Sequence, residues 1–396
     1  MSYNKPDDWV ERNRIGLEKV KRQLQSCIDS VSPKFELALI HHNIGWDQRM
    51  DNEAPIVWHD PILDRYWDQL EELIKQQDIV TDIECINIEN VEITKERLAA
   101  LVDICSSGIA TNSSIDVMFN NANLCDKGIV WLSKLVEVSS QLQTLVINHN
   151  RIDNMESALC LSGSLKLHTC IKMLELSHCD LGNTPEMLSV ILQSDVEIIY
   201  LDNNNIDSLG AVTIAEYLES DPPIVRLVLA CNRLNDNDAI LISQALKRNT
   251  NMRHLLLEGN NFTSIGVKAL LTCVFDSSSL NAISESNHTL VGMNIFSKIN
   301  NKKLQRCIDR LLELDQFQKI VLALQDKDSL LKYLTNVPVE LIPEVLAFPH
   351  GRVDDQYQYK YLNIVYSTMR WWNMPMLYSY LNCVKSDAKR KRNDLL

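Results

Sequence analysis

The chain spells one short pattern five times, with apolar residues at its first, fourth, sixth and eleventh places and Asn or Cys at its ninth. The five copies begin at Leu142, Ile171, Val196, Ile224 and Met252, which lie 29, 25, 28 and 28 residues apart. Recurrence at this period indicates a repeat fold in which each repeat holds one strand and one helix. A single repeat cannot bury its own apolar face, so the repeats must stack on one another.

The ninth place of the pattern is expected to face inward, where the strand ends and the chain turns. An Asn amide at that place offers two donors and an acceptor to backbone groups that the turn leaves unpaired. Cys is a small substitute whose thiol is a weak donor. We therefore predict a structural ladder formed by Asn150, Cys179, Asn204, Asn232 and Asn260.

The second half of each repeat is predicted to be helical, because its apolar residues follow the spacing of one helix face. Ala211, Ile214, Ala215 and Leu218 show that spacing. A strand and a helix in about 28 residues resembles the ribonuclease-inhibitor-like subclass of leucine-rich repeats. The resemblance spans roughly residues 81–296. It implies an α/β fold, a right-handed solenoid curved like a horseshoe, with parallel strands on the concave face and helices on the convex face.

Residues 1–80 and 297–396 flank the predicted repeats. We expect 1–80 to be a helical N-terminal cap that covers the free edge of the first strand. Between them, 81–296 should hold about eight repeats. The last is expected at Leu280, with Ala282, Ser284 and Ser286 facing away from the core. Residues 297–396 are predicted to form a helical C-terminal cap with an aromatic-rich tract, either packed on the cap or serving as an interaction surface, and a basic tail.

The basic tail and the cysteines bear on the compartment. Lys389, Arg390, Lys391 and Arg392 resemble a nuclear-import signal, although such runs also occur as solvated tails. The 11 cysteines form no C-x-x-C pair, which favours reduced thiols. The chain starts with a polar segment and holds no apolar run of ~18 residues. We expect a protein of the cytoplasm, with the nucleus as the alternative, that does not span a membrane.

The outward-facing strand residues predict where a partner binds. Among them we count five carboxylates and only Arg226 as a base, and the formal net charge of the chain is −13. This balance favours a partner protein with a basic surface over nucleic acid. An apolar centre with a charged rim is typical of protein contacts. The candidate partner-binding residues are Met173, Glu175, His178, Ile198, Tyr200, Asp202, Arg226, Val228, His254, Leu256 and Glu258.

Two histidines occupy equivalent places in neighbouring repeats. His149 and His178 directly precede Asn150 and Cys179, so we expect the two imidazoles to lie side by side, close to Glu175. Two imidazoles and a carboxylate are groups that zinc accepts. Exposed histidine pairs are more often without a metal, and we expect no metal at this pair.

The sequence lacks the motifs of common enzyme classes, including the phosphate-binding loop, the dinucleotide-binding glycines, H-E-x-x-H and G-x-S-x-G. We therefore predict a non-enzymatic scaffold or regulator for protein–protein interaction, without a cofactor or small-molecule substrate. The resemblance also implies two alternatives. One is a GTPase-activating protein of the Ran type, against which the basic rather than acidic tail counts. The other is an inhibitor that occludes a basic enzyme, as ribonuclease inhibitors do. The 11 cysteines are fewer, and this repeat array is shorter, than in that group.

Overall fold

The computed structural model describes residues 7–31, 34–40, 56–75, 82–106, 115–124, 126–152, 154–278, 282–283, 285–295, 302–313 and 319. The chain divides into two compact units. The first comprises Met1–Val274 and Asn287–Leu312, and the second comprises Phe275–Ser286 and Glu313–Leu396. The sheet and every site discussed below belong to the first compact unit.

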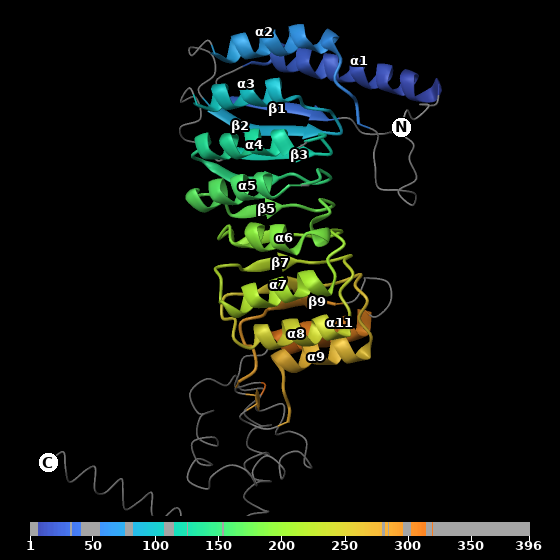
Figure 1. Ribbon diagram of the computed structural model, residues 1–396, viewed down its shortest axis with the longest axis vertical. Coiled ribbons are helices and arrows are strands. Elements are labelled where there is room, and N and C mark those ends of the chain that lie inside the picture. The colour runs from blue at the N-terminus through green and yellow to red at the C-terminus, as the bar shows by residue number, and fades with distance from the viewer. Residues whose placement is uncertain are drawn as a thin grey trace, which may run out of the picture. The chain divides into compact units, whose positions relative to one another are not determined.

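In the described part of the chain, one parallel sheet of nine strands follows the order of the sequence (Figure 1). Each strand pairs with the strand of the next repeat, which is the arrangement that stacked repeats require. The strands are β1 (Lys34–Ile40), β2 (Asp82–Glu89), β3 (Ile115–Asn120), β4 (Leu142–Val146), β5 (Met173–Glu175), β6 (Ile198–Tyr200), β7 (Arg226–Val228), β8 (His254–Leu256) and β9 (Gly292–Asn294).

Helices join the strands and form a second layer along the sheet (Figure 1). Successive helices from α3 to α9 pack on one another in chain order. The helices are α1 (Asp7–Asp29), α2 (Asp64–Lys75), α3 (Lys95–Ser106), α4 (Asp126–Val138), α5 (Met155–Leu167), α6 (Pro185–Leu192), α7 (Ser208–Glu219), α8 (Asp236–Leu246), α9 (Ser264–Val274) and α11 (Lys302–Leu312), with short 3-10 turns η1 (Pro61–Leu63) and η2 (Leu181–Asn183). This alternation confirms the predicted α/β solenoid.

The core lies between the two layers and is lined by the repeated apolar places. In all five copies of the pattern, the first, fourth and sixth residues are at most 6% exposed. The predicted helix face is buried as well, since Ala211, Ile214 and Leu218 of α7 are fully covered. Alternate strand residues enter this core because a strand has a period of two. The others form the opposite surface of the sheet.

An inward-facing Asn amide follows the strand in four of the repeats and bonds to backbone groups of the turn; it is buried in three of them and half-buried at Asn260. The Oδ1 of Asn232 accepts from the backbone N–H of Asn204 and of Ile206, each at 3.0 Å. Its Nδ2 donates to the carbonyls of Leu201 at 2.9 Å and Leu229 at 3.1 Å. Asn150, Asn204 and Asn260 make bonds of the same kind. The thiol of Cys179 instead donates to the Ile147 carbonyl at 3.3 Å.

Strand β1 extends the sheet beyond the predicted repeats, into the segment 1–80 that we expected to be a helical cap without a strand. Leu37 and Leu39 are buried and alternate with the exposed Glu36 and Ala38. That alternation is the signal of a half-buried strand. Helix α1 covers the free edge of β1, where Gln23 Nε2 donates to the Ile40 carbonyl at 2.9 Å. The first strand of the sheet is therefore β1 and not β2, which the cap was expected to cover.

The last strand contradicts the register predicted for the final repeat. We expected a strand around Ala282 to Ser286, but residues 282 and 283 are helical, and β9 lies at Gly292–Asn294. The reason is Asn287, whose Oδ1 accepts from the backbone N–H of Leu290 at 2.9 Å and turns the chain into the strand. Asn249 makes the same bond to Met252 one repeat earlier. The final repeat therefore begins at Leu290.

Some of the residues in the two flanking segments are described by the structure, and others are not. In the N-terminal segment, Tyr66, Trp67, Leu70 and Ile74 of α2 are buried. Helix α11 lies within the predicted C-terminal cap. The aromatic-rich tract and Lys389, Arg390, Lys391 and Arg392 lie outside the described residues. Among the described helices, none is both long and apolar enough to cross a bilayer.

Candidate functional site

The register of the sheet aligns the outward-facing strand residues in rows, which together we call the open face. The first row has one member from each strand: Glu36, Cys85, Asp116, Thr144, Met173, Ile198, Arg226, His254 and Gly292. The middle row is Ala38, Asn87, Met118, Val146, Glu175, Tyr200, Val228, Leu256 and Asn294. Neighbouring members lie one strand spacing, ~4.8 Å, apart.

A third row lies just beyond the strand ends, where backbone bonds continue from repeat to repeat. His178 N–H donates to the Asp202 carbonyl at 3.1 Å, and Cys231 N–H donates to the Glu258 carbonyl at 2.7 Å. The third row is Glu89, Asn120, Asn148, Ser177, Asp202, Ala230 and Glu258. The rows bring together the residues that we predicted to bind a partner, except His178, which directly follows Ser177 of the third row. No contact in the structure tests that role.

The centre of the open face is apolar. Tyr200 lies between Glu175 and Val228 in the middle row, and Ile198 lies between Met173 and Arg226 in the first row. Tyr200 and Ile198 are half-buried, so part of each side chain reaches the surface. Val228 is only 5% exposed. Among the predicted contact residues, Val228 therefore lies beneath its neighbours and offers little surface area to a partner.

Neutral donors orient three carboxylates around this centre. Asn148 Nδ2 donates to Glu175 Oε1 at 2.6 Å, and Ser177 Oγ donates to Asp202 Oδ1 at 2.7 Å. At the far end, Asn294 Nδ2 donates to Glu258 Oε2 at 2.8 Å. An uncharged donor fixes the direction of a carboxylate without cancelling its charge. The open face therefore presents oriented negative charge.

Charge is unevenly distributed along the first row. Glu36 and Asp116 are exposed on either side of Cys85. Burial, followed by the charges of those two carboxylates, raises the pKa of the Cys85 thiol to about 11, so it is protonated at neutral pH. Toward the other end, Arg226 lies beside His254, whose pKa is lowered by burial and then by Arg226. Arg226 is thus the fixed positive charge among the described first-row residues.

His149 and His178 lie side by side, as expected from their equivalent places. Their ring centroids are 4.0 Å apart and the ring planes differ by 13°. Burial, and then His178, lowers the pKa of His149 to about 4. Among the described residues, no group of three or more His, Cys, Asp or Glu side chains is placed to hold a metal ion.

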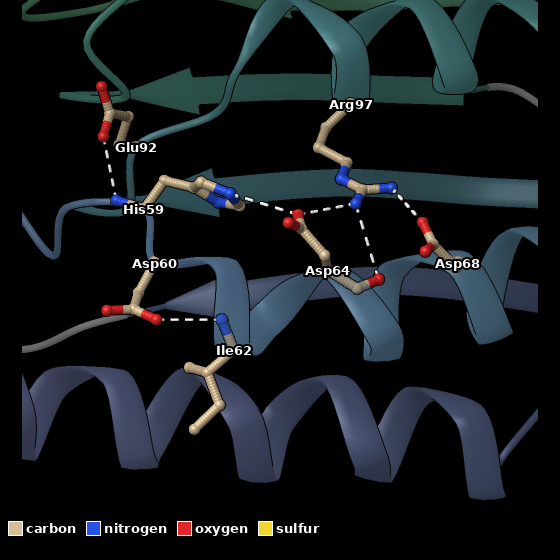
Figure 2. Close-up of polar contacts among 7 residues, drawn as sticks. All are labelled: His59, Asp60, Ile62, Asp64, Asp68, Glu92 and Arg97. Atoms are coloured by element: carbon tan, nitrogen blue, oxygen red, sulfur yellow. Dashed lines mark hydrogen bonds and ion pairs between the residues drawn. The ribbon is translucent and has the colours of Figure 1, made fainter.

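A second polar cluster, not anticipated from the sequence, lies at the N-terminal end of the sheet (Figure 2). Arg97 of α3 contacts Asp64 and Asp68 of α2 at 2.7 Å each. His59 Nε2 lies 3.2 Å from Asp64 Oδ1, and its backbone N–H donates to Glu92 Oε2 at 2.9 Å.

In this cluster, which we call the Arg97 clamp, Arg97 of α3 holds Asp64 and Asp68 of α2. The guanidinium of Arg97 lowers the pKa of Asp64, chiefly by a hydrogen bond. The opposite charges are therefore satisfied within the protein, in contrast to the carboxylates of the open face. No spacing in the sequence could have revealed the cluster, because Arg97 and Asp64 are 33 residues apart and meet only through packing of α2 on α3.

Sequence reasoning also missed four residues of the open face. Glu36 and Ala38 come from β1, and Gly292 and Asn294 come from β9. For β1, the alternation of apolar and other residues was a usable signal. For β9, the usable signal was the apolar spacing of Leu290, Met293 and Ile295, which repeats the first, fourth and sixth places of the pattern.

The chain was compared with family models, curated proteins and solved structures. No family model matches the chain. A Mus musculus protein, "NACHT, LRR and PYD domains-containing protein 5", is 28% identical over 160 residues, which make up 39% of this chain and 14% of that protein. The solved structure of "Leiomodin-1 Actin-Binding Site 2 (ABS2)" has 15% sequence identity and a TM-score of 0.28, over 47% of this chain and 86% of that chain.

The parallel sheet and the strand–helix repeats form a solenoid, and the partial match to the NACHT and LRR protein supports a leucine-rich-repeat-like architecture. The matched segment spans 14% of the mouse protein's length. The function of this chain therefore has to be argued from its own residues.

Proposed function

We propose that this protein is a non-enzymatic interaction scaffold or regulator that binds a partner protein through the open face. One observation supports this above the others. The register sets a half-buried apolar centre around Tyr200 directly beside oriented carboxylates such as Glu175. An apolar centre that can be desolvated within a polar rim is the usual anatomy of a protein-binding surface.

The partner that fits this surface presents basic side chains. Asp116, Glu175, Asp202 and Glu258 lie on the open face, and Arg226 is the strand residue that opposes them. The formal net charge of −13 has the same sign. Such a field attracts a basic protein and repels the phosphates of nucleic acid. We place the protein in the cytoplasm or nucleus on the cysteine and tail arguments above.

Tyr200 is the proposed anchor of the contact. An aromatic residue buries a large area while losing few rotamers, which is why Tyr dominates contact energies between proteins. Repeats of about 28 residues with a full helix also support placement in the ribonuclease-inhibitor-like subclass.

Affinity capture from cell lysate with matched variants tests the proposal. Tyr200→Ala and Asp202→Lys each change the open face. Leu209→Ala and Glu216→Lys make comparable changes on exposed residues of α7 in the same repeat. We expect the wild type and both α7 variants to recover the same protein, and the two open-face variants to lose it. Recovery of that protein by all five forms would contradict a role for the open face.

Salt dependence provides a second, independent readout once the captured protein is purified. Attraction between an acidic face and a basic partner weakens as salt screens the charges. We expect affinity for the wild type to fall steeply between 50 and 500 mM salt, roughly tenfold or more, and to fall less for Asp202→Lys. A salt-independent affinity would contradict the electrostatic part of the proposal.

A further inference from the structure

The stacked imidazoles of His149 and His178 join two neighbouring repeats at the ends of β4 and β5. Both residues have left-handed backbone geometry, with φ of 56° and 59°. The backbone N–H of His149 donates to the Ser177 carbonyl at 2.9 Å, and that of His178 donates to the Asp202 carbonyl at 3.1 Å. The rings therefore lie directly beside the bonds that connect one repeat to the next.

The groups around the pair offer limited compensation for positive charge. Asp202, one repeat further along, acts on both rings and favours their protonation, but burial outweighs it. The Glu175 carboxylate on β5 is engaged by Asn148. On the outer side of the same turns, Arg151 and Asp180 pair with each other at 3.4 Å.

The same row continues with uncharged groups on both sides of the pair. Asn121 and Asn203 occupy the equivalent left-handed positions of the flanking repeats, and the Cys231 thiol follows one repeat later. Burial, followed by the charges of Asp202 and Glu258, raises the pKa of that thiol, which keeps it protonated and neutral. Among the carboxylates of the described neighbours, Asp202 is therefore the one that favours protonation of both imidazoles.

Two imidazoles at this separation respond differently to the first and the second proton. One protonated ring can rest on a neutral ring, because a cation is attracted to an aromatic face. Two protonated rings are like charges a few ångströms apart in a half-buried place, and their repulsion is poorly screened there. The pair can accept the second proton from solvent only if the rings move apart.

We propose that the His149–His178 pair is an acid-sensitive joint in the sheet, stacked while its rings are neutral and separated once both are protonated. Separation weakens the backbone bonds between the turns after β4, β5 and β6, while the apolar core of the repeats is unchanged. The inference does not depend on the identity of any partner or on the proposed function.

Histidine titration by nuclear magnetic resonance tests the coupling on which the joint depends. Protein with isotope-labelled histidine is titrated from pH 8 to 4 as wild type, His178→Asn and His254→Asn. Asn suits position 178 because Asn90, Asn121 and Asn203 adopt φ of 56°, 50° and 56° at equivalent places. We expect the pKa of His149 to rise above about 4 in His178→Asn but to stay below its ordinary value, because burial remains, and to be unchanged in the His254→Asn control.

An unchanged His149 titration in His178→Asn would overturn the proposal, since the rings would then be uncoupled. Hydrogen exchange tests the opening itself. After correction for the intrinsic pH dependence, residues 144–152 and 173–181 should exchange at least several-fold faster at pH 4.5 than at pH 7. Residues 226–234, the matched turn that holds Cys231, should not. Equal acceleration in all three segments, or none in any, would show that the pair is no special joint.

Discussion

The side-chain amide of Gln305 on α11 bonds to the free edge of β9 as a further strand would. Its Nε2 donates to the Met293 carbonyl at 2.7 Å, and its Oε1 accepts from the Ile295 N–H at 3.5 Å. Gln23 of α1 makes the corresponding bond to Ile40 at the other edge of the sheet. Exposed edge strands recruit other chains. Two glutamines from flanking helices therefore cover both ends of the sheet.

Removing the Gln305 amide should expose the edge of β9. We expect Gln305→Ala to lower the free energy of unfolding by about 1 kcal/mol, the usual value of a lost hydrogen bond. The variant should also self-associate more than the wild type. Urea unfolding and light scattering measure the two effects. Gln244→Ala, on the exposed face of α8, is the matched control, and equal behaviour of the two variants would contradict the edge-covering role.

Truncating a buried ladder amide should cost more than losing an edge bond. Asn232→Ala leaves the N–H groups of Asn204 and Ile206 without their acceptor. Because buried unpaired groups are costly, we expect a loss of about 3 kcal/mol in the free energy of unfolding. Asn232→Cys should lose less, since Cys179 already serves at the same place in another repeat. Urea unfolding measures the free energy of both variants. Equal losses in Asn232→Ala and Asn232→Cys would contradict the idea that Cys can replace Asn at this place.

The lowered pKa of His149 should make stability depend on pH. The folded-state pKa is about 4, below the ordinary 6.5. Between these values the unfolded chain binds more protons than the folded protein does. Stability is therefore complete above pH 6.5, falls as pH drops through the window and levels off below pH 4.

Each pKa unit corresponds to about 1.4 kcal/mol, and because His149 is only half-buried we expect a total effect of about 2 kcal/mol after solvent screening. Thermal unfolding at pH 7, 5.5 and 4.5 measures it. In His149→Asn the melting temperature should fall less steeply with decreasing pH than in the wild type. Protonation of carboxylates affects the two proteins alike, so the difference reports His149. Parallel curves for the two proteins would contradict the assignment.

Arg97 should stabilise the N-terminal end of the sheet through geometry as much as charge. Its side chain is 12% exposed and serves Asp64 and Asp68 together (Figure 2). Because both carboxylates are well exposed, Arg97→Ala should lower the free energy of unfolding by only about 1 kcal/mol. Arg97→Lys should recover only part of this stability. It keeps the positive charge, but an ammonium cannot bond to both carboxylates in the forked geometry of a guanidinium.

Thermal unfolding at low and high salt checks this prediction. Lys95→Ala, beside Arg97 on α3 and 57% exposed at its side chain, is the control. It should change the free energy of unfolding by less than about 0.5 kcal/mol. A loss as large as that of Arg97→Ala would show that the clamp has no special role.

The middle of the sheet was predictable, and its two ends were not. From Leu142 to Met252, each copy of the pattern supports the register of the next, because a slipped repeat would expose its apolar residues. At the C-terminal end, Leu280 and Ile283 imitate the start of a repeat, and no following copy corrects the reading. At the N-terminal end, β1 lacks the inward Asn or Cys that follows β4 to β8. Its short alternation was therefore outweighed by the helical stripes around it.

The sequence by itself determined the strand–helix repeat, the order of stacking, the buried face of each strand and the contact between His149 and His178. These follow from periodicity, because equivalent positions of stacked repeats must be neighbours. Tertiary structure alone decided the Arg97 clamp, the donors that orient Glu175 and Asp202, and the glutamines at the sheet edges. The Arg97 and glutamine contacts join elements that the repeat does not relate, whereas the donors to Glu175 and Asp202 lie one repeat away. Their formation depends on rotamers and lateral placement, which no one-dimensional spacing encodes.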